Sequence, residues 1–177
     1  MKKILCSFLF LAIFAQVLWA QGAKKYVLLE HFTNSRCGIC AFRNPDFHDL
    51  IKDYPDDVHH ISFHPSNPYP NCVFHQANPV ENNTRANFYG IFGTPVVFML
   101  GDQVQGSDLL TASQLEAQLM QTSPIALTLD QTLDGQNATV AVTVETFEPV
   151  ASGNFRLYAA VVEKEIDQTT PNGEDTH

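Results

Sequence analysis

The sequence predicts an α/β protein in which helices flank a mixed β-sheet, followed by a partial, sandwich-like all-β region. Two observations support this prediction. Up to Pro124, short strand-like runs alternate with helix-like spacings of apolar residues. After Pro124, apolar and polar residues alternate with a period of two, which is typical of half-buried strands. We therefore expect domains at 24–122 and 124–177, the second of them truncated.

The first half of the sheet domain should contain two strands and one helix. Residues 26–32 form a short run of aromatic, Leu and β-branched residues, which favours a buried strand. A polar turn at 34–36 leads into helical spacing at 41–54, where Pro45 should introduce a kink. Residues 58–63 have the composition of a second strand. The apolar members of the predicted helix are Phe42, Phe47, Leu50 and Ile51.

The second half begins with a long loop at 64–79, because this stretch is rich in Pro and Asn. A helix at 81–89 should stop at Gly90, and a strand at 96–100 should turn back into a short strand at 103–105. The order of elements predicts a parallel crossover between the first two strands, an antiparallel edge hairpin, and helices on both faces.

A closing helix at 111–121 completes the sheet domain, with Leu115 and Leu119 one turn apart and Thr111 or Ser113 as its N-cap. The all-β region should then contain three strands, because three segments alternate with a period of two. These segments are 125–133, 139–146 and 155–162, with turns at Asp134-Gly135 and Gly153-Asn154.

The first 20 residues have the pattern of a secretory signal peptide. Lys2 and Lys3 precede an apolar run at 4–19. This run is short for a membrane-spanning helix, although an uncleaved anchor is the alternative. Export would bring the chain into a compartment where disulfides persist. Three cysteines then remain, so at least one thiol is free or pairs transiently.

Composition excludes some classes of function. Of the 177 residues, 45% are hydrophobic and 16% are charged, which argues against extensive disorder. The formal net charge is −9, and Lys and Arg form no cluster. The sequence therefore predicts no nucleic-acid partner.

The motif Cys37-Gly38-Ile39-Cys40 lies between the first predicted strand and the first predicted helix. The first amides of a helix lack intrahelical partners, and together with the helix dipole they stabilise a thiolate at Cys37. Arg36 adds a neighbouring positive charge. We predict that Cys37 is the nucleophile and that Cys40, one turn later and more buried, resolves the mixed disulfide.

Two other interpretations of the motif stay open. The cysteines can form a purely structural disulfide. Alternatively, Cys37 and Cys40 can bind zinc together with Cys72 and His75, which form a second C-x-x-H pair.

Gly93-Thr94-Pro95 precedes the third predicted strand. A proline there can simply start an edge strand. In combination with the upstream C-x-x-C motif, it predicts a cis-proline beside the disulfide. Such a bond would expose the backbone of Thr94 to an extended substrate.

Between residues 25 and 122 the chain resembles the thioredoxin-like superfamily. The resemblance rests on the strand before CGIC, Pro45 downstream of it, the stretch Gly90-Ile91-Phe92-Gly93-Thr94-Pro95, and Gly101. It implies a mixed sheet flanked by helices, with Cys37 as nucleophile, Cys40 as resolver and Pro95 as the cis-proline. Thr94 and Pro95 would bind substrate.

Three positions depart from the family pattern. CGIC replaces CGPC, Arg36 replaces a common aromatic residue, and His31 replaces a buried acid. His31 can accept the proton of Cys40, since histidine titrates near neutral pH, or it can be a core histidine bonded to the backbone. Glu30 should point to the opposite face.

The predicted loop carries Cys72, a possible accessory thiol. The loop can act as a substrate lid, or Cys72 can exchange with the motif, but a surface excursion with a buried lone cysteine is the favoured interpretation. His59 and His60 are adjacent in a strand and face opposite ways, so we expect them to be structural and predict no metal site.

The wider arrangement of the chain also resembles the twenty-eight-kilodalton outer-membrane-protein family of Gram-negative bacteria. The resemblance rests on the export signal, the segment VLLEHFT, the C-x-x-C motif, the GTP turn, and a β region that contains VVEKEI and PNG. This resemblance implies a periplasmic or outer-membrane-associated location. The predicted function is an exported thiol:disulfide oxidoreductase, of reductase or isomerase type, without a cofactor. It would act on disulfides of envelope or secreted proteins and use a redox partner.

The sequence also permits two alternative functions. One is an outer-membrane or surface binding protein with a structural disulfide. The other is a metal carrier that uses the Cys/His cluster.

Overall fold

The computed structural model describes residues 22–149, 153, 155–164 and 166, and it divides into two compact units. One unit contains residues 26–120 and the described residues from 156 onward, and the other contains the described residues of 22–25 and 121–155. The predicted signal peptide at 1–20 lies outside the described residues. Within the described part of the chain, no helix is long and apolar enough to cross a membrane.

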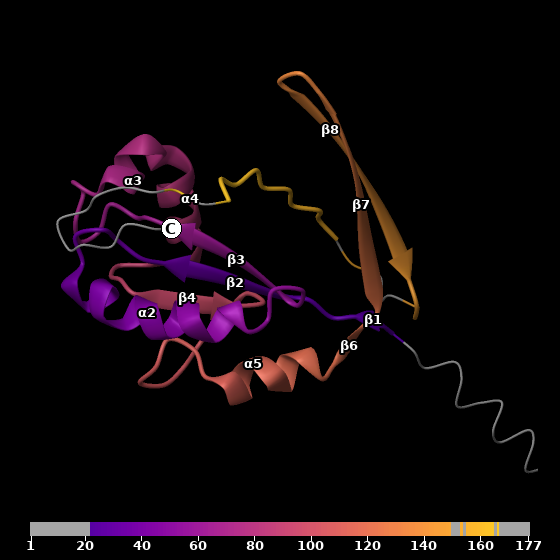
Figure 1. The fold of residues 1–177 in the computed structure, drawn as a ribbon, viewed down its shortest axis with the longest axis horizontal. Coiled ribbons are helices and arrows are strands. Elements are labelled where there is room, and N and C mark those ends of the chain that lie inside the picture. The colour runs from indigo at the N-terminus through magenta and orange to yellow at the C-terminus, as the bar shows by residue number, and fades with distance from the viewer. Residues whose placement is uncertain (1–21, 150–152, 154, 165, 167–177) are drawn as a thin grey trace, which may run out of the picture. The chain divides into compact units, whose positions relative to one another are not determined.

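A four-stranded sheet with the order β3-β2-β4-β5 forms the centre of the larger unit (Figure 1). β2 pairs in parallel with β3 and antiparallel with β4, which in turn pairs antiparallel with β5. The predicted parallel crossover and edge hairpin are therefore confirmed. The strands are β2 (Val27–Phe32), β3 (Val58–Phe63), β4 (Val96–Met99) and β5 (Asp102–Gln103).

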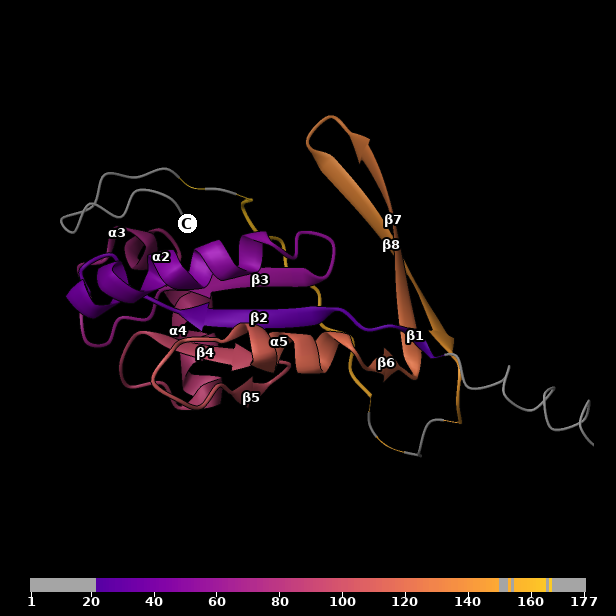
Figure 2. The same cartoon turned by 60° about the horizontal axis from the view of Figure 1, so that its bottom comes forward.

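Helices cover both faces of this sheet, as the order of elements predicted (Figure 2). On one face, Phe47 and Leu115 bring two helices against Val27 and Leu29 of β2. On the other face, Ala86 packs with Phe32 and Phe98. The helices are α2 (Gly38–Lys52) and α5 (Ala112–Leu119) on the first face, α4 (Pro79–Tyr89) on the second, and the short α3 (Val73–Ala77) before α4.

The helix ends follow local chemistry. α4 ends at Gly90, whose φ of 66° is the left-handed conformation expected of a glycine C-cap. Thr111 caps α5: its side chain accepts a hydrogen bond from the Gln114 amide, and the Gln114 side chain accepts one from the Thr111 amide. α2 begins at Gly38, earlier than predicted, and continues as one helix through Pro45.

The prediction of one long loop at 64–79 was wrong. α3 lies inside this stretch, and Pro79 is the first residue of α4. Proline is well suited to that position because the first amide of a helix has no acceptor within the helix. The Pro/Asn-rich composition of this stretch therefore includes the start of a helix as well as loop residues.

The smaller unit is rich in β structure, as expected. Short strands β1 (Ala23–Lys24) and β6 (Thr122–Ser123) pair with each other, and β7 (Ile125–Asp134) forms a hairpin with β8 (Asn137–Thr146). The predicted third strand at 155–162 is wrong, because these residues form no regular element. Alternation gives a segment two distinct faces, but a strand also requires a neighbouring edge for its backbone hydrogen bonds.

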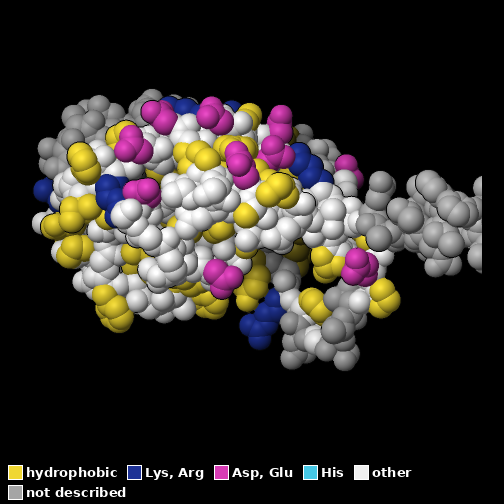
Figure 3. Space-filling model, turned by 90° about the horizontal axis from the view of Figure 1, so that it is seen from below, with side chains coloured by type: hydrophobic (Ala, Val, Ile, Leu, Met, Phe, Trp, Pro, Cys, Tyr) yellow, Lys and Arg dark blue, Asp and Glu magenta, His cyan; other side chains and the backbone are white. Residues whose placement is uncertain are grey.

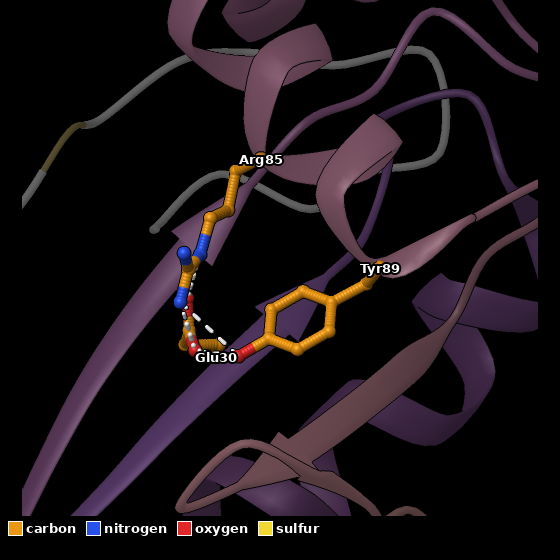
Figure 4. Close-up of polar contacts among 3 residues, drawn as sticks. All are labelled: Glu30, Arg85 and Tyr89. Carbon is orange, nitrogen blue, oxygen red and sulfur yellow. Dashed lines mark hydrogen bonds and ion pairs between the residues drawn. The ribbon is translucent and has the colours of Figure 1, made fainter. Parts of the chain in front are cut away.

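An ion pair between the buried Glu30 and the partly exposed Arg85 links β2 to α4 (Figure 4). The Glu30 side chain points away from the face that α2 covers, and the residue is only 3% exposed. Arg85 donates to both of its carboxylate oxygens, with distances of 2.5 and 2.8 Å, and the Tyr89 hydroxyl donates to the same carboxylate at 2.6 Å. Burial, followed by this hydrogen bond, raises the pKa of Tyr89 to about 12.

Replacing Arg85 with methionine should lower the free energy of unfolding by about 3 kcal/mol, because it leaves the buried Glu30 carboxylate without its cation. Urea denaturation followed by circular dichroism measures this loss. The matched control is Lys52→Met, which removes the ion pair with Asp49, whose side chains are 72% and 73% exposed. The control should have almost no effect. Equal losses in the two variants would contradict a structural role for the buried pair.

Candidate thiol–disulfide site

Cys37 and Cys40 form a disulfide at the amino-terminal end of α2, with their Cα atoms 5.1 Å apart. Cys37 is the N-cap residue, and its Sγ accepts a hydrogen bond from the Cys40 amide at 3.1 Å. In the reduced protein this donor and the helix dipole would stabilise a thiolate on Cys37. Cys37 is 3% exposed and Cys40 is 0% exposed, so both residues are buried and only Cys37 keeps any accessible surface.

The Gly93-Thr94-Pro95 turn faces this disulfide. The Thr94–Pro95 peptide bond is cis, the geometry that the sequence predicted. The carbonyl oxygen of Thr94 lies 3.5 Å from Cys37 Sγ. The hydroxyl of Thr94 is shielded from solvent and has no hydrogen-bond partner among the described residues. A pocket of about 310 Å³ lies beside the turn, lined by residues 89–96 and Gln103.

Large exposed apolar side chains lie close in sequence to the two cysteines and to the cis-proline turn. Ile39, Phe42 and Phe92 are all largely exposed, although Phe42 was expected among the apolar residues of the helix. Figure 3 shows apolar side chains gathered at the left end of the molecule, the end at which α2 begins in Figure 1. An exposed apolar surface beside a reactive group is typical of a binding site for another molecule.

Asn34 holds the segment 65–72 against the turn that precedes Cys37. Its side-chain amide donates to the carbonyl oxygens of Pro65 and Tyr69, both at 3.1 Å, and its side-chain oxygen accepts from the Arg36 amide at 3.0 Å. The guanidinium of Arg36 donates to the carbonyl oxygen of Asn71 at 2.8 Å. Residues 67–71 are exposed, so the segment runs over the surface as expected, but these hydrogen bonds fix it beside Cys37.

Cys72 is free and fully buried, as expected of a lone cysteine in that segment. The Ser35 hydroxyl donates to its sulfur at 3.2 Å, and Nδ1 of His64 lies 3.9 Å from the same atom. Exchange between Cys72 and another disulfide would require segment 65–72 to move. Its role as an accessory thiol stays a prediction.

The zinc site considered from the sequence does not correspond to this arrangement. Cys37 and Cys40 are bonded to each other, and Nδ1 of His75 donates to the His64 carbonyl oxygen at 2.9 Å. Among the described residues, the histidine, cysteine and acidic side chains whose ligand atoms converge are instead His31, His48 and His60.

His31 is completely buried on the α2 face of β2. Its ring lies 4.7 Å from that of Phe47 and 5.6 Å from that of His60, measured between ring centres. Burial, with a contribution from Lys52, lowers the pKa of His48. His48 was not predicted as a site residue, because only the packing of α2 brings it near the other two rings. A role for His31 as proton acceptor stays a prediction.

No protein-family model matches the chain, and no curated protein sequence matches it either.

Replacing Asn34 with alanine should release segment 65–72 and expose Cys72, because it removes two hydrogen bonds to that segment, one of them buried and the other partly buried. Alkylation of the oxidised protein under native conditions, followed by mass spectrometry, measures the exposure of this thiol. Cys72 should react at least about tenfold faster in the variant, the effect of roughly 1.4 kcal/mol on local opening. The control is Asn87→Ala on the exposed side of α4. An unchanged rate for Asn34→Ala would show that other contacts hold the segment.

Proposed function

We propose that this chain is an exported thiol:disulfide oxidoreductase with a thioredoxin-like domain, acting on disulfides of envelope or secreted proteins. The observation that carries the proposal is the position of Cys37. This residue keeps 3% of its surface exposed, and its sulfur caps α2 and lies 3.5 Å from the carbonyl oxygen of Thr94, which precedes a cis-proline. The periplasm or the outer membrane of a Gram-negative bacterium is the proposed location, on the resemblances of the sequence.

In the reducing direction, the Cys37 thiolate attacks one sulfur of a substrate disulfide and releases the other as a thiolate. Cys40 then loses its proton and attacks Sγ of Cys37. The Cys37–Cys40 disulfide forms again, and the second substrate sulfur leaves as a thiol. Two electrons pass to the substrate, so a dithiol redox partner must reduce the protein before another cycle. Isomerisation would instead end when a different thiolate of the substrate attacks the mixed disulfide, which forms a new substrate disulfide and releases Cys37 as a thiolate.

The surroundings of Cys37 suit a polypeptide substrate. The backbone at Thr94 can pair with an extended segment, the adjacent pocket can take one of its side chains, and Ile39, Phe42 and Phe92 can contact apolar residues beside the disulfide. A substrate cysteine surrounded by apolar residues is typical of a protein that is incompletely folded.

A binding protein with an inert disulfide is the second candidate, and the β7–β8 hairpin favours it. Paired residues of an antiparallel ladder share a face, so the register places apolar side chains of both strands on one side of the hairpin. Most of these side chains are exposed, namely Leu127, Leu129, Leu133, Val140 and Val144. Such a face can bind a partner without redox chemistry.

The reduction potential of the Cys37–Cys40 pair separates the two candidates. Equilibration with glutathione buffers, followed by alkylation and mass spectrometry, gives its value. The oxidoreductase proposal predicts a potential between about −270 and −120 mV, the range of thiol:disulfide enzymes. A potential below about −300 mV is typical of a structural disulfide and would favour the binding protein.

Single-cysteine variants test the order of attack. Cys37→Ser should abolish reduction of a model disulfide substrate, whereas Cys40→Ser should accumulate a mixed disulfide with that substrate, detected by non-reducing electrophoresis. Cys72→Ala is the matched control and should keep its activity, since Cys72 is buried. Full activity in Cys37→Ser would rule out the proposed mechanism.

A further inference from the structure

Three histidines converge on the α2 face of the sheet. His60 of β3 pairs with Leu29 of β2, and His31 lies two residues beyond Leu29, so both histidines point to the same face. His48 comes from α2, which covers that face. One ring nitrogen of each histidine lies within 4.8 Å of the others.

We propose that His31, His48 and His60 together bind one zinc ion. Neutral imidazole is a preferred ligand of zinc, and three histidines with an open fourth position form a known type of zinc site. Zinc–nitrogen bonds of about 2.0–2.1 Å in a tetrahedral site place the ligand atoms roughly 3.3 Å apart. Rotations that move each ring nitrogen by about 1 Å would close the present spacing to that value.

The surroundings of the three rings suit an ion. Nε2 of His48 is shielded from solvent and has no hydrogen-bond partner among the described residues. A buried polar nitrogen of this kind normally has a partner, which a metal ion would supply. The Ser62 hydroxyl lies 3.4 Å from Nε2 of His60 and can orient that ring.

Access and local charge also permit binding. His31 is completely buried, but His48 and His60 are partly exposed, so an ion and a water ligand can enter from their side. Lys52 is the nearby cation that opposes a metal, and its charge is balanced by an ion pair with Asp49 at 2.8 Å.

Aromatic packing is the competing explanation of the cluster. Phe47 lies 4.7 to 5.5 Å from all three histidine rings, measured between ring centres, so the four rings pack together between α2 and the sheet. Packing alone requires only flat rings. Metal binding requires a nitrogen from each histidine, so substitutions that keep or remove that nitrogen distinguish the two.

The test uses the chain without a histidine tag and with the Cys37–Cys40 disulfide intact, so that these two thiols cannot bind metal. After treatment with EDTA, the protein is dialysed against micromolar ZnCl₂, and bound zinc is measured by mass spectrometry. We expect one zinc per chain and a higher melting temperature with zinc. Because the protein is kept oxidised, the result is independent of the proposed redox function.

Variants locate the ion. His48→Gln should weaken zinc binding at least about 100-fold. Losing a group that only hydrogen-bonds to a metal ligand costs about 10- to 100-fold in affinity, and losing the ligand itself should cost more. His60→Gln serves as a second variant in case the first fails to fold. The control is His59→Gln, which lies beside His60 but on the opposite face of the sheet and should bind zinc normally. No zinc at micromolar concentration, or equal binding by folded His48→Gln, His60→Gln and His59→Gln, would overturn the proposal.

Discussion

The alternation of side chains along β2 is the constraint on which the rest of the larger unit depends. β2 is the strand that pairs with both β3 and β4, and helices pack on both of its faces. Leu29 and His31 point toward α2, whereas Glu30 and Phe32 point toward α4. A shift of one residue in its register would exchange these faces, bringing Glu30 into an apolar cluster and separating it from Arg85.

The same strand determines where the disulfide lies. β2 ends at Phe32, and the turn that follows is fixed by buried polar groups rather than by apolar packing. Asn44 of α2 donates to the Thr33 hydroxyl at 2.9 Å, and Asn34 holds the amide of Arg36. Because unsatisfied polar groups are costly when buried, these bonds specify one path from the strand into α2. Cys37 therefore lies at the N-cap of α2 with its sulfur directed at Thr94.

The parts of the fold that the sequence predicted well are those governed by local pattern. The bounds of β3 agree with the predicted 58–63, and the stop of α4 at Gly90 follows from a glycine in the left-handed conformation. The parts that were missed depend on tertiary contacts. Asn34 reaches carbonyl groups at Pro65 and Tyr69, far along the chain, and nothing local identifies such acceptors.

The incorrect prediction of a strand at 155–162 has the same origin. An alternating segment becomes a strand only where the edge of another strand can form hydrogen bonds with its backbone. The candidate site divides similarly. The disulfide and the cis bond could be predicted from the sequence because C-x-x-C and Gly-Thr-Pro are compact motifs. The convergence of His31, His48 and His60 was not, since it combines the register of β2 and β3 with the rotation of α2.

The two sites share elements but differ in chemistry. β2 and α2 carry both Cys37 with its supporting turn and two of the three histidines, and β3 supplies the third. An ion bound by these histidines would link the three elements at a point within the sheet–helix interface. It would limit movement of α2 relative to the strands while leaving both sulfur atoms unligated. Since the N-cap geometry at Cys37 depends on where α2 starts relative to β2, a metal at that interface would preserve this geometry when the disulfide opens.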